Sequence, residues 1–176
     1  MDSTLPSGYH LIRNQKTFDV SALVAAARFA SKPDFDPCWE EYDFSQIFYI
    51  ISGSGVMTTE EGSFPFSPGM MIYRPAFHRS IYHWDTEDVR FALIDFVCES
   101  EAMEVFAREP IRLYEEESAT LLDVLKTTAR ICKPYTVTDP MLGMRIKPNI
   151  PTVVLSFVYA SLERFLAMVY CRITGI

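Results

Sequence analysis

Short apolar segments recur between residues 47 and 97, and each is ended by glycine, proline or acidic turn residues. The segments are rich in β-branched and aromatic side chains and cover residues 47–52, 56–59, 64–66, 70–73, 81–84 and 89–97. Short strands separated by regular turn signals are typical of antiparallel sandwiches and barrels. The spacing therefore predicts a β-rich fold for this half of the chain.

The period of the apolar residues changes after residue 98. Residues 115–133 predict an amphipathic helix whose acidic first turn and basic last turn suit the helix dipole. Its expected apolar stripe is Leu121, Leu122, Leu125 and Ala129. Pro134 is expected to end it, and four prolines predict an irregular connection over 134–151. A second helix is predicted over 152–173, with Gly175 as its C-terminal stop.

Length, composition and charge limit the class of protein. The chain has 176 residues, 49% of them hydrophobic and 22% charged, which fits one folded domain. Its net charge of −7 argues against nucleic-acid binding by this chain alone, because phosphate contacts need surplus Lys and Arg. Four widely spaced cysteines predict free thiols in a reducing cytoplasm. They are Cys38, Cys98, Cys132 and Cys171.

One stretch, 152–170, is nearly long enough to span a bilayer but carries Glu163 and Arg164 near its middle. Charge is costly there in lipid, so we expect a buried or interfacial helix of a soluble protein and no membrane partner. Residues 1–10 do not have the pattern of a signal peptide.

A second kind of signal lies in the order of a few glycine, proline and histidine residues. Gly69 is followed by five residues and Pro75, and His78 comes soon after. This order resembles the second of two short motifs of cupin barrels. That motif ends in an asparagine, where Tyr82 stands here.

Counting back from Gly53 puts Gln46 at the glutamate of the first cupin motif. Depending on the spacing, the histidine pair of that motif falls on Trp39 and Glu41 or on Glu40 and Tyr42. Three of the four metal ligands of the family are therefore replaced. The resemblance implies a chain without a catalytic metal, and we expect no cofactor.

The phrases QIFYIISGSGVM, FSPGMMIYRPAFHRS and FALIDFVCES, followed by two helices, resemble the effector-binding domain of AraC-type transcription regulators of firmicute-like bacteria. The resemblance covers about residues 18–176. It implies a mainly β fold with α: a small cupin-like barrel (double-stranded β-helix) over 1–110, then a helical dimerisation segment over 111–176, in one structural domain. In that family a helix-turn-helix domain follows, so we expect an excised sensor domain that meets DNA only through that absent domain.

Polar and aromatic side chains on the expected strands and turns are the candidate ligand contacts. They are Trp39, Gln46, Tyr49, Arg74, His78, Arg79, Tyr82 and Trp84. Which strand residues face inward stays open, because a slip of one residue inverts every choice. Most aromatics are more simply explained as barrel core, because half of the strand residues must face inward, whereas His78 is equally consistent with a satisfied histidine at a strand end. The expected effector is a small polar molecule, and a saccharide is compatible with the aromatic, acidic composition.

The second helix carries two apolar stripes. The first follows 3-4-3-4 spacing and is the expected homodimer seam: Leu155, Val158, Leu162, Phe165 and Val169. The other consists of Tyr159, Leu166, Tyr170 and Ile173. Two stripes need two partners, which favours a homodimer over a central helix buried inside its own monomer.

Common catalytic motifs (GxSxG, the P-loop, HExxH and the dinucleotide fingerprint) do not occur in the sequence. We therefore expect no enzyme activity and favour a sensor domain. Two alternatives stay open: a stand-alone cupin enzyme, such as a metal-dependent isomerase or dioxygenase, and a binding module without a signalling role.

Overall fold

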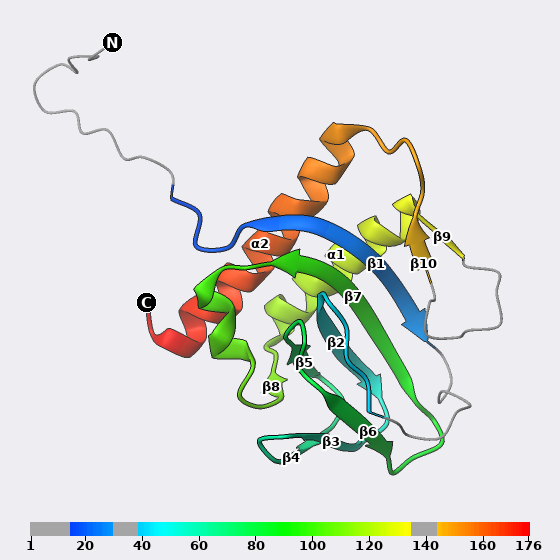
Figure 1. Cartoon of the computed structure of the whole chain (residues 1–176), viewed down its shortest axis with the longest axis vertical. Helices are drawn as coiled ribbons and strands as arrows, with labels where there is room; N and C mark the ends of the chain where they lie inside the picture. The colour runs from blue at the N-terminus through cyan, green and yellow to red at the C-terminus, as the bar shows by residue number, and fades with distance from the viewer. Residues whose placement is uncertain (1–14, 30–38, 135–143) are drawn as a thin grey trace, which may run out of the picture.

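The computed structural model describes residues 15–29, 39–134 and 144–176, which form two sheets and two long helices (Figure 1). The larger sheet has the order β8-β5-β2-β7-β1-β10-β9 and the smaller one the order β4-β3-β6. The strands of the larger sheet are β1 (Val20–Phe29), β2 (Ser45–Ser52), β5 (Met70–Arg74), β7 (Arg90–Cys98), β8 (Ile111–Arg112), β9 (Cys132–Pro134) and β10 (Met144–Ile146). The smaller sheet contains β3 (Gly55–Thr59), β4 (Ser63–Phe66) and β6 (Ser80–Trp84). A 3-10 turn, η1 (Glu101–Phe106), precedes β8, and the helices are α1 (Glu115–Ile131) and α2 (Thr152–Thr174).

Alternation along the strands creates two cores on opposite faces of the larger sheet. On β2, Ile47 belongs to the core shared with the helices, whereas Phe48 and Ile50 belong to the core between the two sheets. This period of two follows from the pleat of a strand. The prediction of a mainly β, cupin-like barrel followed by two C-terminal helices is confirmed.

α1 and α2 cover the face of the larger sheet that points away from the small sheet (Figure 1). The expected stripe of α1 is rotated: Val124 and Thr128 are buried, but Ala129 is exposed. The sheet therefore contacts a face of α1 slightly different from the one that the leucine spacing indicated. Gly175 ends α2 in the left-handed conformation, with φ of 75°, as predicted.

The expected dimer seam of α2 needs correction. Four of its five residues, Val158, Leu162, Phe165 and Val169, are at most 1% exposed within one chain. They pack into the core between α2, α1 and the larger sheet, and only Leu155 is partly exposed. Side chains without accessible surface do not contact a second copy of the chain, so these four are core residues of the monomer. The alternative of a helix buried in its own chain holds for this stripe.

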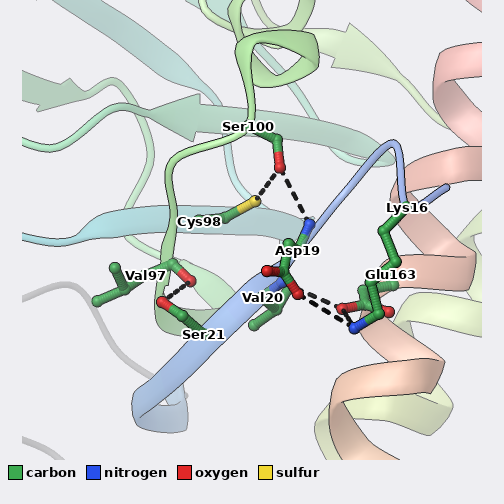
Figure 2. Close-up of polar contacts among 8 residues, drawn as sticks. All are labelled: Lys16, Asp19, Val20, Ser21, Val97, Cys98, Ser100 and Glu163. Carbon is green, nitrogen blue, oxygen red and sulfur yellow. Dashed lines mark hydrogen bonds and ion pairs between the residues drawn. The ribbon is translucent and has the colours of Figure 1, made fainter.

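The segment before β1 binds the middle of α2 (Figure 2). Glu163 Oε1 accepts hydrogen bonds from Lys16 Nζ at 3.0 Å and from the Val20 backbone N–H at 3.1 Å. The buried Phe18 ring packs 5.9 Å from the Phe106 ring and 5.6 Å from that of Tyr170. By length and composition α2 is able to cross a membrane, with mean hydropathy of 1.5. One face of the helix is buried within the chain, and the contacts of Glu163 attach it to the segment before β1.

Of the region expected to be irregular, 134–151, residues 135–143 lie outside the described part of the chain, and the residues on either side of them contribute to a strand pair. Cys132 of β9 is in register with Ile146 of β10, and β10 continues the sheet through Ala25 of β1. α1 therefore ends at Ile131, before Pro134. Three of the four cysteines are free thiols: Cys98 and Cys132 are buried as expected, and Cys171 is exposed. Cys38 lies outside the described residues.

Candidate functional site

Three polar side chains lie side by side across the inner face of the larger sheet. The register pairs Gln46 of β2 with Arg74 of β5 on one side and with Asp95 of β7 on the other. Each of the three is only 3–5% exposed. Gln46 Nε2 donates to Asp95 Oδ1 at 2.7 Å. We call Arg74, Gln46 and Asp95 the polar row; it continues the inward-facing positions that Phe48 fills further along β2.

The guanidinium of Arg74 is held from several sides. Its Nη1 donates to Glu40 Oε2 and to Ser80 Oγ, both at 2.9 Å. A two-way backbone bridge between Glu40 and Ser80, at 2.9 and 3.1 Å, holds the carboxylate in place. The rings of Tyr42 and Tyr82 lie 4.7 and 5.9 Å from the Arg74 Cζ atom. One edge of the guanidinium is therefore fixed, and aromatic faces surround it.

Within the part of the chain that the structure describes, three buried polar atoms meet no hydrogen-bond partner: Arg74 Nη2, Gln46 Oε1 and Tyr82 Oη. Ser80 lies beside the Tyr82 hydroxyl without reaching hydrogen-bond geometry. A buried polar atom without a partner costs about 1–3 kcal/mol, so such atoms are rare in folded proteins. The donor Arg74 Nη2 and the acceptor Gln46 Oε1 lie on neighbouring strands without partners, so together they are suited to hydrogen bonds with a polar ligand.

Burial also changes the acid–base properties of the polar row. It raises the pKa of the Asp95 carboxyl from 3.8 to about 7, although the hydrogen bond from Gln46 and the charge of Arg74 oppose the shift. Burial likewise raises the pKa of Tyr82, whose phenol stays neutral. Asp95 therefore exchanges a proton near neutral pH, a property that is common at functional sites.

A cavity of about 320 Å³ opens at the same end of the barrel. Arg74 and Ser80 belong both to its wall and to the hydrogen-bonded cluster described above. The remaining lining residues are Glu41, Met57, Thr59, Glu60, Glu61, Tyr73, Pro75, Phe77, His78, Arg79 and Ala107. Phe77 lies in the left-handed region, with φ of 62°, and its N–H donates to the Tyr42 carbonyl at 2.7 Å. Such conformations are sparsely populated and cluster at ligand sites.

The structure brings together most of the side chains that the sequence indicated. Gln46 and Arg74 belong to the polar row, the Tyr82 ring lies 5.9 Å from the Arg74 Cζ atom, and His78 and Arg79 line the cavity. Trp39 is 45% exposed, and the Arg79 guanidinium lies 5.5 Å above its ring.

Two expected contacts lie elsewhere. Tyr49 faces the helices, because odd-numbered residues of β2 point away from the small sheet. Trp84 stacks on Phe91 at 5.6 Å and packs edge-on against Phe66 at 4.9 Å, so it belongs to the apolar core between the sheets. That core fills the other end of the barrel, so the candidate site lies at the end that holds the polar row.

Four residues of the site were not among the expected ligand contacts: Glu40, Tyr42, Ser80 and Asp95. Glu40 and Tyr42 entered the sequence analysis only as one possible position of the histidine pair of the first cupin motif. Asp95 had a usable signal, since it is the one acidic residue inside the apolar strand β7, in phase with the inward-facing Phe91 and Leu93. Glu40 and Ser80 meet through an isolated bridge between distant segments, which no local pattern records.

The donor set suits an organic ligand. Across residues 15–29, 39–134 and 144–176, no group of three His, Cys, Asp or Glu side chains is placed to hold a metal ion. The open groups are an amide oxygen, a guanidinium nitrogen and a phenol, which recognise hydroxyl, amide or carbonyl groups by hydrogen bonding.

No protein-family model matches this chain, and no curated protein matches it by sequence. Among solved structures, apo ToxT K231A from Vibrio cholerae has a TM-score of 0.52 at 11% identity. That match covers 89% of this chain and 58% of ToxT, so the chain spans little more than half of that protein. The likeness shows a shared fold over barrel and helices.

Two further structures match over shorter regions. The AraC-like transcriptional activator CuxR matches with a TM-score of 0.43 and 11% identity, over 72% of this chain and 43% of CuxR. A cupin protein (BF4112) from Bacteroides fragilis matches with a TM-score of 0.32 and 15% identity, over 53% and 86% of the two chains. The structural neighbours thus include an AraC-like regulator and cupin proteins.

Proposed function

We propose that this chain is the ligand-sensing domain of a bacterial AraC-type transcription regulator and that the polar row binds a small polar effector. The observation that carries the proposal is the pair of open, buried atoms Arg74 Nη2 and Gln46 Oε1 on neighbouring strands, where Arg74 also lines a cavity of about 320 Å³. The cupin-like fold supports it, since the barrel supplies the row and the helices provide the route to a second domain. The protein acts in the cytoplasm and carries out no catalytic step.

The chemistry of the site favours an uncharged effector. On the cavity wall the charge of Arg79 is matched by Glu41 at 3.9 Å and that of Arg74 by Glu40 at 2.9 Å, and Glu60 and Glu61 add further negative charge. An anion gains little there, because like charges oppose it. A hydroxyl both donates and accepts, so it satisfies Gln46 Oε1 and Arg74 Nη2 together. A saccharide offers several hydroxyls, and the exposed ring of Phe77 on the cavity wall suits the flat face of a sugar.

Signalling in this proposal depends on a homodimer. With the first stripe of α2 buried, the surface for a second copy moves to the exposed face of the helix, which carries Val153, Phe157, Ala160 and Arg164. Val153 and Phe157 are 74% and 58% exposed. The effector binds one arrangement of the pair better than another and so shifts their equilibrium. DNA is contacted through a separate helix-turn-helix domain.

Thermal-shift screening against neutral saccharides and polar metabolites tests the proposal. A ligand at one hundred times its Kd raises stability by about 2.7 kcal/mol, which for a domain of this size corresponds to a Tm increase of about 5–10 °C. We expect Gln46→Met to abolish the increase for a compound that stabilises the wild type. Tyr49→Phe, on the same strand but the opposite face, is the matched control and retains it. A library without any stabilising compound, or a hit unaffected by Gln46→Met, contradicts the proposal.

A further inference from the structure

The orientation of one side-chain amide decides what an effector meets in the polar row. The Gln46 amide has a donating end, Nε2, and an accepting end, Oε1. Nε2 is engaged by Asp95 Oδ1 at 2.7 Å, which leaves Oε1 open. Its neighbour on the other strand, Arg74, has the open donor Nη2. The amide therefore links a titratable carboxyl on one side to the ligand-binding groups on the other.

We propose that Asp95 and Gln46 form a proton-operated selector, in which the charge of Asp95 sets the end of the Gln46 amide that the effector meets. This inference rests on the proposed function. An ionised carboxylate only accepts, so it holds Nε2 and presents Oε1 to the site. A protonated carboxyl donates its O–H, so the amide turns over, Oε1 accepts that proton and Nε2 faces the site. The proton is taken from solvent by the carboxylate, and no covalent bond to carbon or nitrogen changes.

The two states recognise different groups. With Asp95 ionised, the site offers an acceptor from Gln46 beside a donor from Arg74, which fits a hydroxyl or a primary amide. With Asp95 protonated, both residues donate, which fits a group with two acceptors, such as a carboxylate. A neutral hydroxyl or amide group has its donor and its acceptor both satisfied only in the ionised state, and the acidic side chains of the cavity wall oppose anions, so we assign effector binding to the ionised state. The effector is therefore a neutral molecule bearing hydroxyl or amide groups.

Both charge states are populated near neutral pH, because burial raises the pKa of Asp95 to about 7. Arg74 faces the carboxyl from β5, and Glu40 faces it from the segment before β2; their charges act in opposite directions. The Tyr42 phenol also lies in the field of Asp95, and burial keeps it neutral by raising its pKa. The partner of Asp95 on β1 is Ala25, which is uncharged.

The selector predicts how affinity follows pH. Only the ionised fraction binds, so the apparent Kd rises as that fraction falls. For a carboxyl that titrates near pH 7, the ionised fraction grows about tenfold between pH 6 and pH 8. Binding of a neutral effector is thus about tenfold tighter at pH 8, and below pH 7 it releases a proton from Asp95.

The first experiment needs no ligand. Protein labelled with ¹⁵N and with ¹³C at the Asp carboxyl is titrated by NMR from pH 5.5 to 8.5, and loss of a signal in Gln46→Met assigns the Gln46 amide. We expect that amide and the Asp95 carboxyl to titrate with one midpoint near pH 7. Asp95→Asn should leave the Gln46 amide independent of pH, whereas Asp88→Asn, an exposed position just before β7, should retain the titration. A Gln46 signal that stays constant while Asp95 titrates overturns the selector.

The second experiment measures the affinity of three probes, erythritol, acetamide and acetate, by chemical-shift changes at pH 6 and pH 8. We expect erythritol and acetamide to bind about tenfold more tightly at pH 8, and acetate to show no such gain. Neutral probes whose affinity is the same at both pH values refute the selector but leave the proposed function standing. If the Gln46 amide titrates and neither these probes nor the effector screen yields binding, the proton-dependent turn of the amide is supported, whereas the proposed function fails and with it effector recognition by the selector.

Discussion

Asp95 is the residue at which burial has the largest chemical effect. Its pKa is about 7 in the folded chain against 3.8 for an ordinary aspartate, so between these values the folded state binds more protons than the unfolded state. The free energy of unfolding therefore decreases as pH rises through this window and levels off above it. From pH 5 to pH 8 the loss amounts to about 2–3 kcal/mol.

We expect Asp95→Asn to remove this dependence, because an amide does not ionise. Urea unfolding of the wild type and the variant at pH 5, 6, 7 and 8 measures the difference. Asp123→Asn, an exposed carboxylate on α1, is the control and should follow the wild type. Parallel stability curves for wild type and Asp95→Asn would show that the buried carboxyl does not titrate in this range.

At this scale the sequence predicted residue types better than their directions. Gln46 came from a motif position and Arg74 from its place at a strand end, and both reach the polar row. Tyr49 was named as a candidate ligand contact with its facing left open, and it lies on the helix side, because the inward phase of β2 depends on pairing with β5 and β7. Glu40 and Ser80 depend on contact between segments far apart in the chain, for which local periodicity carries no signal.

The two faces of α2 are the clearest case at the scale of an element. The 3-4-3-4 spacing correctly indicated a buried stripe, but spacing does not distinguish the chain's own core from a second copy.

We expect Leu162→Ala to lower the free energy of unfolding by about 2–5 kcal/mol, because Leu162 has no exposed surface. Phe157→Ala, 58% exposed on the opposite face, should cost less than about 0.5 kcal/mol in a monomer. Urea unfolding at low protein concentration measures both, and equal losses would contradict this assignment of the faces.

A bidentate ion pair between Arg172 and Glu117 connects the last turn of α2 to the first turn of α1. Arg172 Nε and Nη2 donate to Glu117 Oε1 and Oε2 at 2.6 and 3.0 Å, and the guanidinium lies 4.4 Å from the Tyr114 ring. The Glu117 carboxylate also accepts the Tyr114 N–H, which caps α1. The sequence indicated only the acidic start of α1; the partner on α2 follows from the packing of the helices.

We expect a double-mutant cycle of Arg172→Met and Glu117→Gln to give a coupling energy of about 1–3 kcal/mol, since the pair is bidentate and Glu117 is buried. Arg172→Lys should recover only part of it, because an ammonium does not form the fork. The free energies of unfolding come from urea titrations at neutral pH. A coupling energy below about 0.3 kcal/mol would reduce the pair to an ordinary surface contact.

For the whole molecule, the sequence indicated the β-rich half and both helices because their signals are local. Turn residues between β2 and β7 and the apolar period of α1 and α2 need no knowledge of the partners. β1 was missed, since its alanine-rich stretch becomes a strand by pairing with β7, about seventy residues away. The pairing of β9 with β10 was missed for the same reason: the prolines between them indicated only an irregular connection.

Assembly belongs to this largest scale, and the exposed face of α2 makes it testable. Val153, Phe157, Ala160 and Arg164 follow 4-3-4 spacing, so they lie on one side of the helix, and two copies are able to pack these faces about a two-fold axis. We expect the wild type to sediment as a dimer at tens of micromolar (roughly where weak interfaces dissociate).

Phe157→Glu places a charge in the centre of this face, and we expect it to weaken the dimer by about 100-fold or more while the circular dichroism stays that of the folded chain. Phe77→Glu, 70% exposed beside the cavity, is the matched control and should remain dimeric. A monomeric wild type, or a Phe157→Glu variant that still forms dimers, would remove this face from the assembly.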